Sequence, residues 1–280
     1  MSGETTYSAI ASWLPDIVQA TEMYLMKDLV MPSIVQVFND QVGLRPRRDD
    51  KYTEGTVATL TEGTDLTSAQ SINRTPFGTL TPKEIGNFTV ITLDRIASDP
   101  ISDIVADLAE WATFQVREQV EKDLLAAFPN FTGGTVGNAG SALTWDTIIN
   151  GQALLRAAGV PGPYNVVLHE YAYTKLATAR ANALPIVFQQ KLLDANRYYL
   201  GSFGDMDFYT TGVLAAGTAV KQGIFSKKAV AYDNRRPIMI EGQYFVTLRG
   251  TKYVLTHEYA AGAWRTDHGV QIVSDASVPS

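Results

Sequence analysis

The pattern of apolar and polar residues changes abruptly near residue 87. Residues 49–86 are polar and rich in turn-forming residues, without the periodicity of a core element. Residues 88–96 alternate apolar and polar side chains, as a half-buried strand does. Residues 99–128 carry apolar side chains at helical spacing, and a helix of this length is about 45 Å long. This order favours a subunit that reaches over a neighbour rather than a catalyst built around a pocket.

The predicted long helix has defined ends and two different faces. Asp99 is a good N-cap, Pro100 suits the first helical position, and Pro129 should stop the helix. We expect one face to be buried, with Ile101, Ile104, Val105, Leu108, Trp111, Ala112, Val116, Val120, Leu124, Ala127 and Phe128. We expect the other face to be polar, with Glu110, Arg117, Glu118, Glu121 and Lys122.

The region before this helix predicts a helix, a linker and an arm. Residues 16–39 show helical spacing, and Pro32 should kink or split that helix. Residues 43–50 (GLRPRRDD) read as a solvated linker with a local basic cluster. Residues 51–60 and 71–80 predict a two-stranded arm with a turn-rich tip at 61–70. Because an isolated hairpin is marginal in water, we expect other chains to hold this arm.

The second half of the chain mixes helices and strands. Residues 144–158 and 170–182 predict helices, the first with Thr144 as its N-cap. Residues 165–168 predict a short buried strand, and residues 207–212 predict another strand. Later residues are mainly β-type, at 220–233, 237–241, 243–248, 253–259 and 269–274. Strands concentrated late in the chain indicate an α+β fold rather than a doubly wound parallel sheet.

Composition narrows the classes of protein. The chain has 280 residues with 45% apolar and 19% charged residues, which suffices for a sizeable core in one large or two modest domains. Its net charge of −6 argues against a nucleic-acid reader but is compatible with a wall that faces packed DNA. The sequence has no cysteine, so disulfides, thiolate metal sites and cysteine nucleophiles are excluded. Neither a signal peptide nor a membrane-spanning run is visible in the sequence.

The sequence contains only weak signals for a catalytic or binding site. Gly133, Gly134, Gly137 and Gly140 form a glycine-rich loop, but the loop follows a helix and lacks the Gly-Lys-Ser/Thr ending of a phosphate loop. We expect it to be a flexible connector. The histidines His169, His257 and His268 lack metal-ligand spacing, and the motif G-x-S-x-G is absent. We therefore assign no catalytic, cofactor-binding or metal-binding residue and expect no enzyme and no cofactor.

The order of elements resembles the major capsid protein of tailed double-stranded DNA bacteriophages, whose architecture is called the Johnson fold. The words that carry the resemblance are LTEGTDL at residues 60–66, FTVITLDRIASDPISDIVADLAEW at 88–111, VEKDLLAAF at 120–128, LTWDTIINGQALLRAAGVPGPYNVVLHEYAY at 143–173, GIFSKKAVAYD at 223–233 and WRTDHGVQIVSD at 264–275. The resemblance implies an N-terminal arm (residues 1–48), an extended loop that lies over the adjacent subunit (49–86), a peripheral domain with a long spine helix (87–129 and 220–280) and an axial domain (130–219).

The same resemblance implies a structural function. It predicts self-assembly into an icosahedral shell of hexamers and pentamers that encloses double-stranded viral DNA, with a portal and a scaffold or cement protein as partners and no membrane. The subunit would assemble in the host bacterial cytoplasm and end in the virion. The covalent lysine–asparagine crosslink of some relatives is not carried over, because Lys51 and Lys83 have no marked partner. Two alternatives remain at this point: an encapsulin-type bacterial compartment shell, and a soluble α+β enzyme with an unrecognised site.

Overall fold

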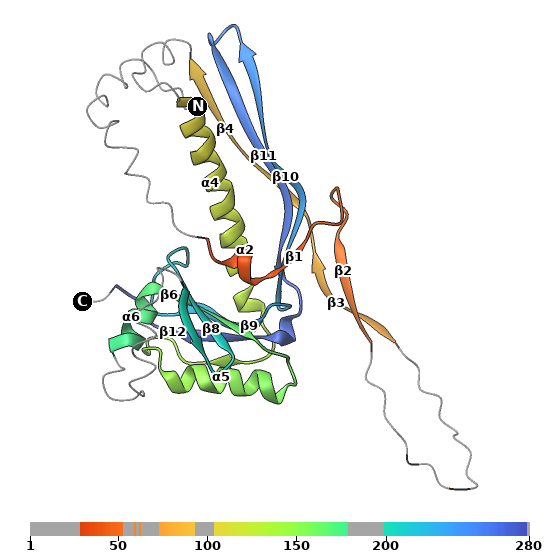
Figure 1. The fold of residues 1–280 in the computed structure, drawn as a ribbon, viewed down its shortest axis with the longest axis vertical. Coiled ribbons are helices and arrows are strands. Elements are labelled where there is room, and N and C mark those ends of the chain that lie inside the picture. The colour runs from red at the N-terminus through yellow and green to blue at the C-terminus, as the bar shows by residue number, and fades with distance from the viewer. Residues whose placement is uncertain are drawn as a thin grey trace.

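The protein is an elongated molecule with two differently built ends (Figure 1). The computed structural model describes residues 29–52, 59, 62, 73–92, 104–178 and 199–278. A long sheet with a parallel helix forms one end, and a compact unit of short strands and helices forms the other. The expected α+β class is confirmed.

The long sheet has four strands in the order β1-β10-β11-β4. These strands are β1 (Gln36–Phe38), β10 (Val230–Phe245), β11 (Gly250–Ala263) and β4 (Lys83–Thr92). Residues 237–241 and 243–248 were expected as separate strands, whereas β10 continues through most of this region. Its register shifts between Asn234 and Met239. Pro237 lies within this irregular stretch and has no N–H to give to a ladder, so the strand bends there without ending.

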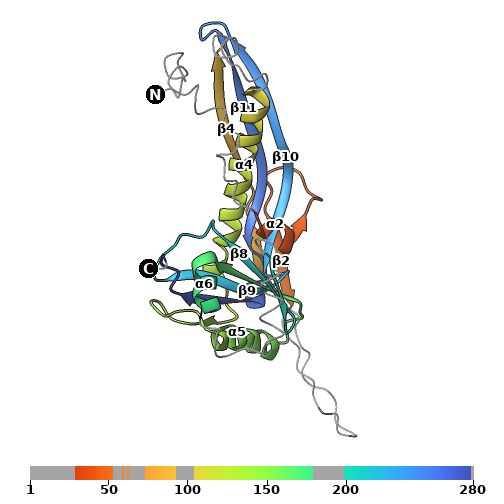
Figure 2. The same cartoon turned by 60° about the vertical axis from the view of Figure 1, so that its left-hand side comes forward.

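The long helix, α4 (Ile104–Leu125), packs along one face of the long sheet (Figures 1 and 2). At about 1.5 Å per residue its 22 residues span about 33 Å. The predicted start at Asp99 and Pro100 lies outside the described residues. The helix ends at Leu125, and Pro129 lies inside the following 3-10 turn (Phe128–Asn130) rather than stopping the helix directly.

The predicted faces of α4 are partly confirmed. Val116, Val120, Leu124, Ala127 and Phe128 are buried, as expected. Arg117 and Lys122 are exposed, and Trp111 is only half-buried. Glu121 contradicts the prediction, because its side chain is fully buried. The segment that covers it, residues 30–35, comes from the distant N-terminal part of the chain, which no helical periodicity could reveal.

The compact unit is a six-stranded mixed sheet in the order β5-β12-β9-β6-β8-β7. Its strands are β5 (Thr135–Val136), β12 (Gly269–Ser274), β9 (Val220–Ser226), β6 (Tyr164–His169), β8 (Met206–Thr211) and β7 (Tyr199–Phe203). The helices α5 (Trp145–Ala157) and α6 (Glu170–Thr178) belong to this unit. Thr144 caps α5 as predicted, since its hydroxyl accepts a hydrogen bond from the Thr147 N–H at 3.3 Å.

This sheet pairs strands from two regions that were expected in different domains. β9 and β12 lie in residues 220–280, which were expected to join the long helix in a peripheral domain. They pair instead with β6 and β5 of the region 130–219. The chain therefore leaves the compact unit after Ser226, makes the long β10–β11 hairpin, and returns for β12. The chain returns to the compact unit because β12 pairs with β9, the strand from which the chain left, as its antiparallel neighbour.

The N-terminal region also differs from expectation. Residues 1–28, and with them residues 16–28 of the helix predicted at 16–39, lie outside the described residues. In the remainder, α2 (Met31–Ile34) is a single short turn, and β1 follows at Gln36. Val30, Met31, Ile34 and Val35 are buried against α4 and the strands beside it. In the described part of the predicted helix, the apolar spacing therefore corresponds to a short buried segment, residues 30–35, that ends before β1.

The predicted arm is confirmed at its base. β2 (Arg47–Tyr52) and β3 (Arg74–Leu80) form an antiparallel pair that stands away from the rest of the molecule (Figure 1). Its tip at residues 61–70 lies almost entirely outside the described residues. The expected end of the extended loop at Gly86 is too late, since β4 begins at Lys83 and belongs to the long sheet.

Candidate assembly surface

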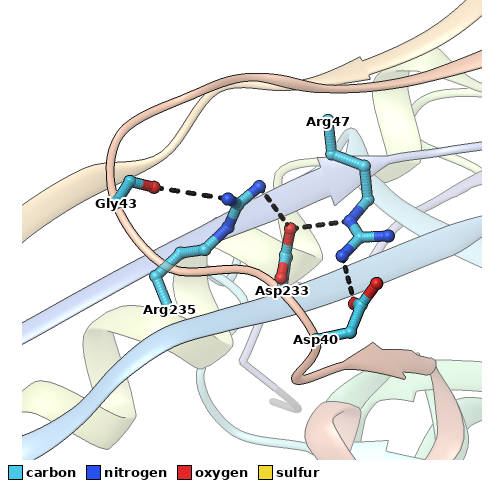
Figure 3. Close-up of polar contacts among 5 residues, drawn as sticks. All are labelled: Asp40, Gly43, Arg47, Asp233 and Arg235. Atoms are coloured by element: carbon cyan, nitrogen blue, oxygen red, sulfur yellow. Dashed lines mark hydrogen bonds and ion pairs between the residues drawn. The ribbon is translucent and has the colours of Figure 1, made fainter.

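One buried carboxylate holds the base of the arm on the long sheet. Asp233 of β10 has no exposed surface, and its Oδ2 accepts a hydrogen bond from Arg47 Nε of β2 at 2.8 Å. The same oxygen lies 2.7 Å from Arg235 Nη2, and the Arg235 side chain is also fully buried. Figure 3 shows both guanidinium groups converging on Asp233. A single strand residue therefore fixes two arginines.

The loop between β1 and β2 is bound by the same arginines. Arg235 Nη1 donates a hydrogen bond to the Gly43 carbonyl at 3.3 Å, and Arg47 also binds Asp40 (Figure 3). The Arg47 guanidinium holds the pKa of the Asp40 carboxyl below its usual value. Its planar group also lies 4.2 Å from the Phe38 ring centre, which is a favourable cation–π distance. The prediction of a solvated linker at residues 43–50 holds for Leu44, Arg45 and Arg48, which are exposed, but not for Arg47, which is bound to the long sheet.

The segment that follows β11 holds the other side of the arm. Arg265 Nε donates to Asp49 Oδ2 at 2.9 Å, and Lys51 lies 3.8 Å from Asp267. Gly78 of β3 lies against the backbone of Trp264, where a Cβ atom would be 2.3 Å from the Trp264 carbonyl oxygen. The absence of a side chain at residue 78 is therefore a condition for this contact. These tethers lie within one chain, so the base of the arm does not depend on other chains for its position.

The outer face of the long sheet, opposite α4, carries exposed apolar side chains. Tyr259 donates a hydrogen bond to Asp123 of α4, and Leu255, four residues earlier on β11, shares the face of Tyr259. Val254 lies on the opposite face, where Phe88 of β4 is its direct partner in the ladder. Phe88 is 63% exposed, and Lys252 lies 4.4 Å from its ring centre. We call Phe88, Val90, Met239 and Val254 the outer-face patch.

The end of the β10–β11 hairpin adds further exposed apolar side chains, of which Tyr244 lies on the sheet face of Tyr259 because its ladder partner is Thr251. Tyr244, Val246 and Leu248 are exposed, Val246 by 76%. Residues 242–249 are exposed apart from Phe245, which is half-buried. Exposed apolar residues that gather at one end of a molecule mark a protein–protein contact more often than scattered ones do. This hairpin end and the outer-face patch form the candidate assembly surface together with the arm.

The glycine-rich loop has a structural role that differs from the predicted one. Gly133 N–H donates to the Gly269 carbonyl at 3.0 Å, and Thr135–Val136 pairs with β12. A Cβ atom on Gly137 would lie 2.3 Å from the Val273 carbonyl oxygen, and the φ of Gly137 is +80°. The loop is thus packed closely against the compact sheet, and the prediction of a flexible connector is wrong.

Each histidine has its own structural partners. His169 Nδ1 accepts a hydrogen bond from the Tyr171 N–H at 3.0 Å, and His257 bridges Tyr232 and the Arg236 carbonyl. His268 lies 3.7 Å from Asp267. Burial lowers the pKa of all three side chains. Within the described part of the chain, no group of three or more His, Asp or Glu side chains is arranged to hold a metal ion.

The described helices contain no membrane span. None of them is both long enough and apolar enough to cross a bilayer.

The comparisons with known proteins agree with this geometry. A family model described as phage capsid protein matches residues 77–272. A structure from Mycobacterium phage Che8 has 16% sequence identity and a TM-score of 0.70, and the match covers 88% of this chain and 91% of the other. The capsid structure of cyanophage P-SCSP1u has 12% identity and a TM-score of 0.66, over 99% and 92%. The mature capsid of bacteriophage PhiM1 has 14% identity and a TM-score of 0.67, over 91% and 89%. No curated protein matches this sequence.

The fold and the family match define the chain as a shell subunit of a phage head. It belongs to the phage capsid protein family. It is the major capsid protein of its virion, and its role is structural rather than enzymatic. The family match decides against the two alternatives, the encapsulin-type compartment shell and the soluble enzyme.

Proposed function

We propose that this subunit assembles into a closed icosahedral shell of hexamers and pentamers that encloses double-stranded viral DNA. The observation that carries the proposal is that one molecule has both an arm fixed at its base and an apolar sheet face that its own chain leaves uncovered. The two features are different surfaces, so a contact between them is heterologous. Heterologous contacts close into rings when the rotation permits.

The proposal assigns a role to each part of the molecule. The arm, residues 47–80, lies over the adjacent subunit and covers apolar surface there. The long sheet and α4 form the peripheral domain, and the compact unit with β9 and β12 included forms the axial domain near the centre of each capsomer. The division follows the sheet pairing rather than the boundaries expected from sequence.

Further partners follow from the proposed shell. A portal occupies one vertex, and a scaffold or cement protein assists assembly or reinforces the shell. The packaged DNA is contacted without sequence specificity, and the net charge of −6 keeps its binding to the phosphates weak.

The test is assembly of the purified protein. Sedimentation velocity and negative-stain electron microscopy should detect closed megadalton particles, alone or after co-expression with neighbouring genes of its source genome. Phe88→Ser should abolish the particles without lowering the melting temperature of the subunit, because Phe88 is already 63% exposed. A monomer at every concentration and in every co-expression would refute the proposal.

A further inference from the structure

The strongest anomaly outside the assembly surface is the buried side chain of Glu121. It lies on α4 with 0% exposure, between the buried residues Val120 and Leu124. Its Oε1 accepts from the Val30 N–H at 3.2 Å, and its Oε2 accepts from the Met31 N–H at 3.0 Å. None of the ion pairs among the described residues includes Glu121. The carboxyl group is thus held by two neutral backbone donors.

These two donors belong to the point where the N-terminal segment joins the body. Val30 precedes the short turn α2 and has no side-chain cap, so Glu121 provides acceptors for N–H groups that the turn leaves free. The Asn165 side chain donates to the Ile34 carbonyl at 3.1 Å on the other side of this segment. Glu121 and Asn165 therefore bind the backbone of residues 30–35, a buried and otherwise apolar segment that we call the plug.

Ionisable side chains surround Glu121 on α4 and on the strands that face this helix. On α4 these are Arg117, Glu118, Lys122 and Asp123; on the sheet face that carries Tyr259 they are Lys83, Tyr232, His257 and Tyr259. Lys122 pairs with Glu118 at 3.1 Å, and Lys83 pairs with Asp123 at 2.6 Å. The pKa of Glu121 is set by burial, which raises it to about 7, against the lowering effect of the two backbone N–H groups.

We propose that Glu121 is a pH-sensitive anchor that holds residues 30–35, and with them the attachment of the N-terminal segment, on the long helix, and that this hold weakens as the pH rises from acidic to neutral. The anchored carboxyl has a higher pKa than a detached, solvated one, which titrates near 4.5. The anchor is therefore fully effective below the detached value and is lost as the pH rises through about 7. Between the two pKa values, detachment lets the carboxyl group lose its proton and reach water as a carboxylate.

Hydrogen exchange measures this release directly. In unassembled full-length subunits, the opening constant of the peptide covering residues 30–38 is obtained after correction for the intrinsic pH dependence of exchange. It should rise about tenfold between pH 6 and pH 8.5 if the pKa values are near 7 anchored and 4.5 detached. The strand β6 in the compact sheet is the internal reference, and its opening constant should not change.

Two variants separate the carboxyl from the rest of the plug. Glu121→Gln keeps the acceptor and the shape but cannot ionise, so its opening constant should be the same at both pH values. Glu118→Gln is the matched control on the same helix, and it should keep the tenfold rise. A wild-type peptide without pH dependence, an equal rise in β6, or a tenfold rise in Glu121→Gln would each overturn the proposal. The wild-type measurement suffices if Glu121→Gln does not fold.

Discussion

At the scale of single residues, burial decides what an ion pair contributes. Asp233 and Asp205 are both paired with arginines, at 2.7 Å and 3.1 Å respectively. Asp233 and its partner Arg235 have no exposed side-chain surface, whereas the Asp205 side chain is 74% exposed. Removing a buried partner leaves a charge without water or counter-ion, but removing an exposed partner leaves a hydrated one.

Asp233→Asn should therefore destabilise the subunit by about 3–5 kcal/mol, since it leaves the buried Arg235 without its counter-ion and weakens the hold on Arg47. Urea unfolding of unassembled subunits measures the change. Asp205→Asn is the control and should cost about 0–1 kcal/mol. Asparagine tolerates the left-handed backbone of residue 205, where φ is 67°. Equal costs in the two variants would mean that Asp233 is not the centre of the arm base.

At the scale of elements, close backbone approach positions the arm as much as charge does. Gly78→Ala places a Cβ atom 2.3 Å from a backbone oxygen of Trp264, so β3 must move away from the end of β11. Overpacking of this kind costs about 1–3 kcal/mol. Gly217→Ala is the control, because a Cβ atom there meets nothing within 4 Å. We expect Gly78→Ala to lower the melting temperature and to speed limited proteolysis in the arm, and Gly217→Ala to do neither.

The buried face of α4 gives a second prediction at this scale. Leu124 is fully buried in the cluster that joins the helix, residues 30–35 and the strands β9 to β11. Leu124→Ala should cost about 2–5 kcal/mol in the free energy of unfolding. Lys122→Ala, two residues away, removes an exposed lysine that pairs with Glu118 and should cost about 0–1 kcal/mol. Chemical denaturation of both variants should rank them in this order.

Elements with local signals were predictable from the sequence. The cap at Thr144, the buried run of β6 and the two-stranded arm each depend on neighbouring residues, and each is confirmed. Contacts between distant segments were not predictable. Glu121 is buried by residues some ninety positions away, and β12 joins the compact sheet by pairing with β9. Helical periodicity had placed Glu121 on the solvated face, because it contains no information about what a neighbouring segment covers.

The candidate surface was predictable in outline but not in detail. The arm and its reach were evident from the polar segment before the long helix. The basic cluster at Arg45, Arg47 and Arg48 was interpreted as part of a solvated linker, since Asp233, the partner of Arg47, lies 186 residues further along the chain. A bulky apolar residue on an alternating strand, such as Phe88, signals a covered face, but only the fold shows that its own chain leaves it open.

At the scale of the whole molecule, the base and the tip of the arm serve different processes. Its base is tied to its own chain by Arg47–Asp233 and Arg265–Asp49. Its tip, residues 61–70, contains one large apolar residue, Leu66, and cannot build a core of its own. Folding of the subunit should therefore depend on the base, and assembly should depend on the tip.

Deleting residues 61–70 tests this division. We expect a folded subunit with a melting temperature close to that of the wild type, because the β2–β3 base and its tethers remain. We also expect no closed particles in negative-stain micrographs, since the shortened arm cannot reach its neighbour. Replacing the ten residues by a glycine–serine segment of equal length is the control for reach, and it should restore particles only if length matters more than side chains. A deletion variant that fails to fold would place the tip in the core of the subunit, and a variant that still forms shells would show that the base alone makes the contact.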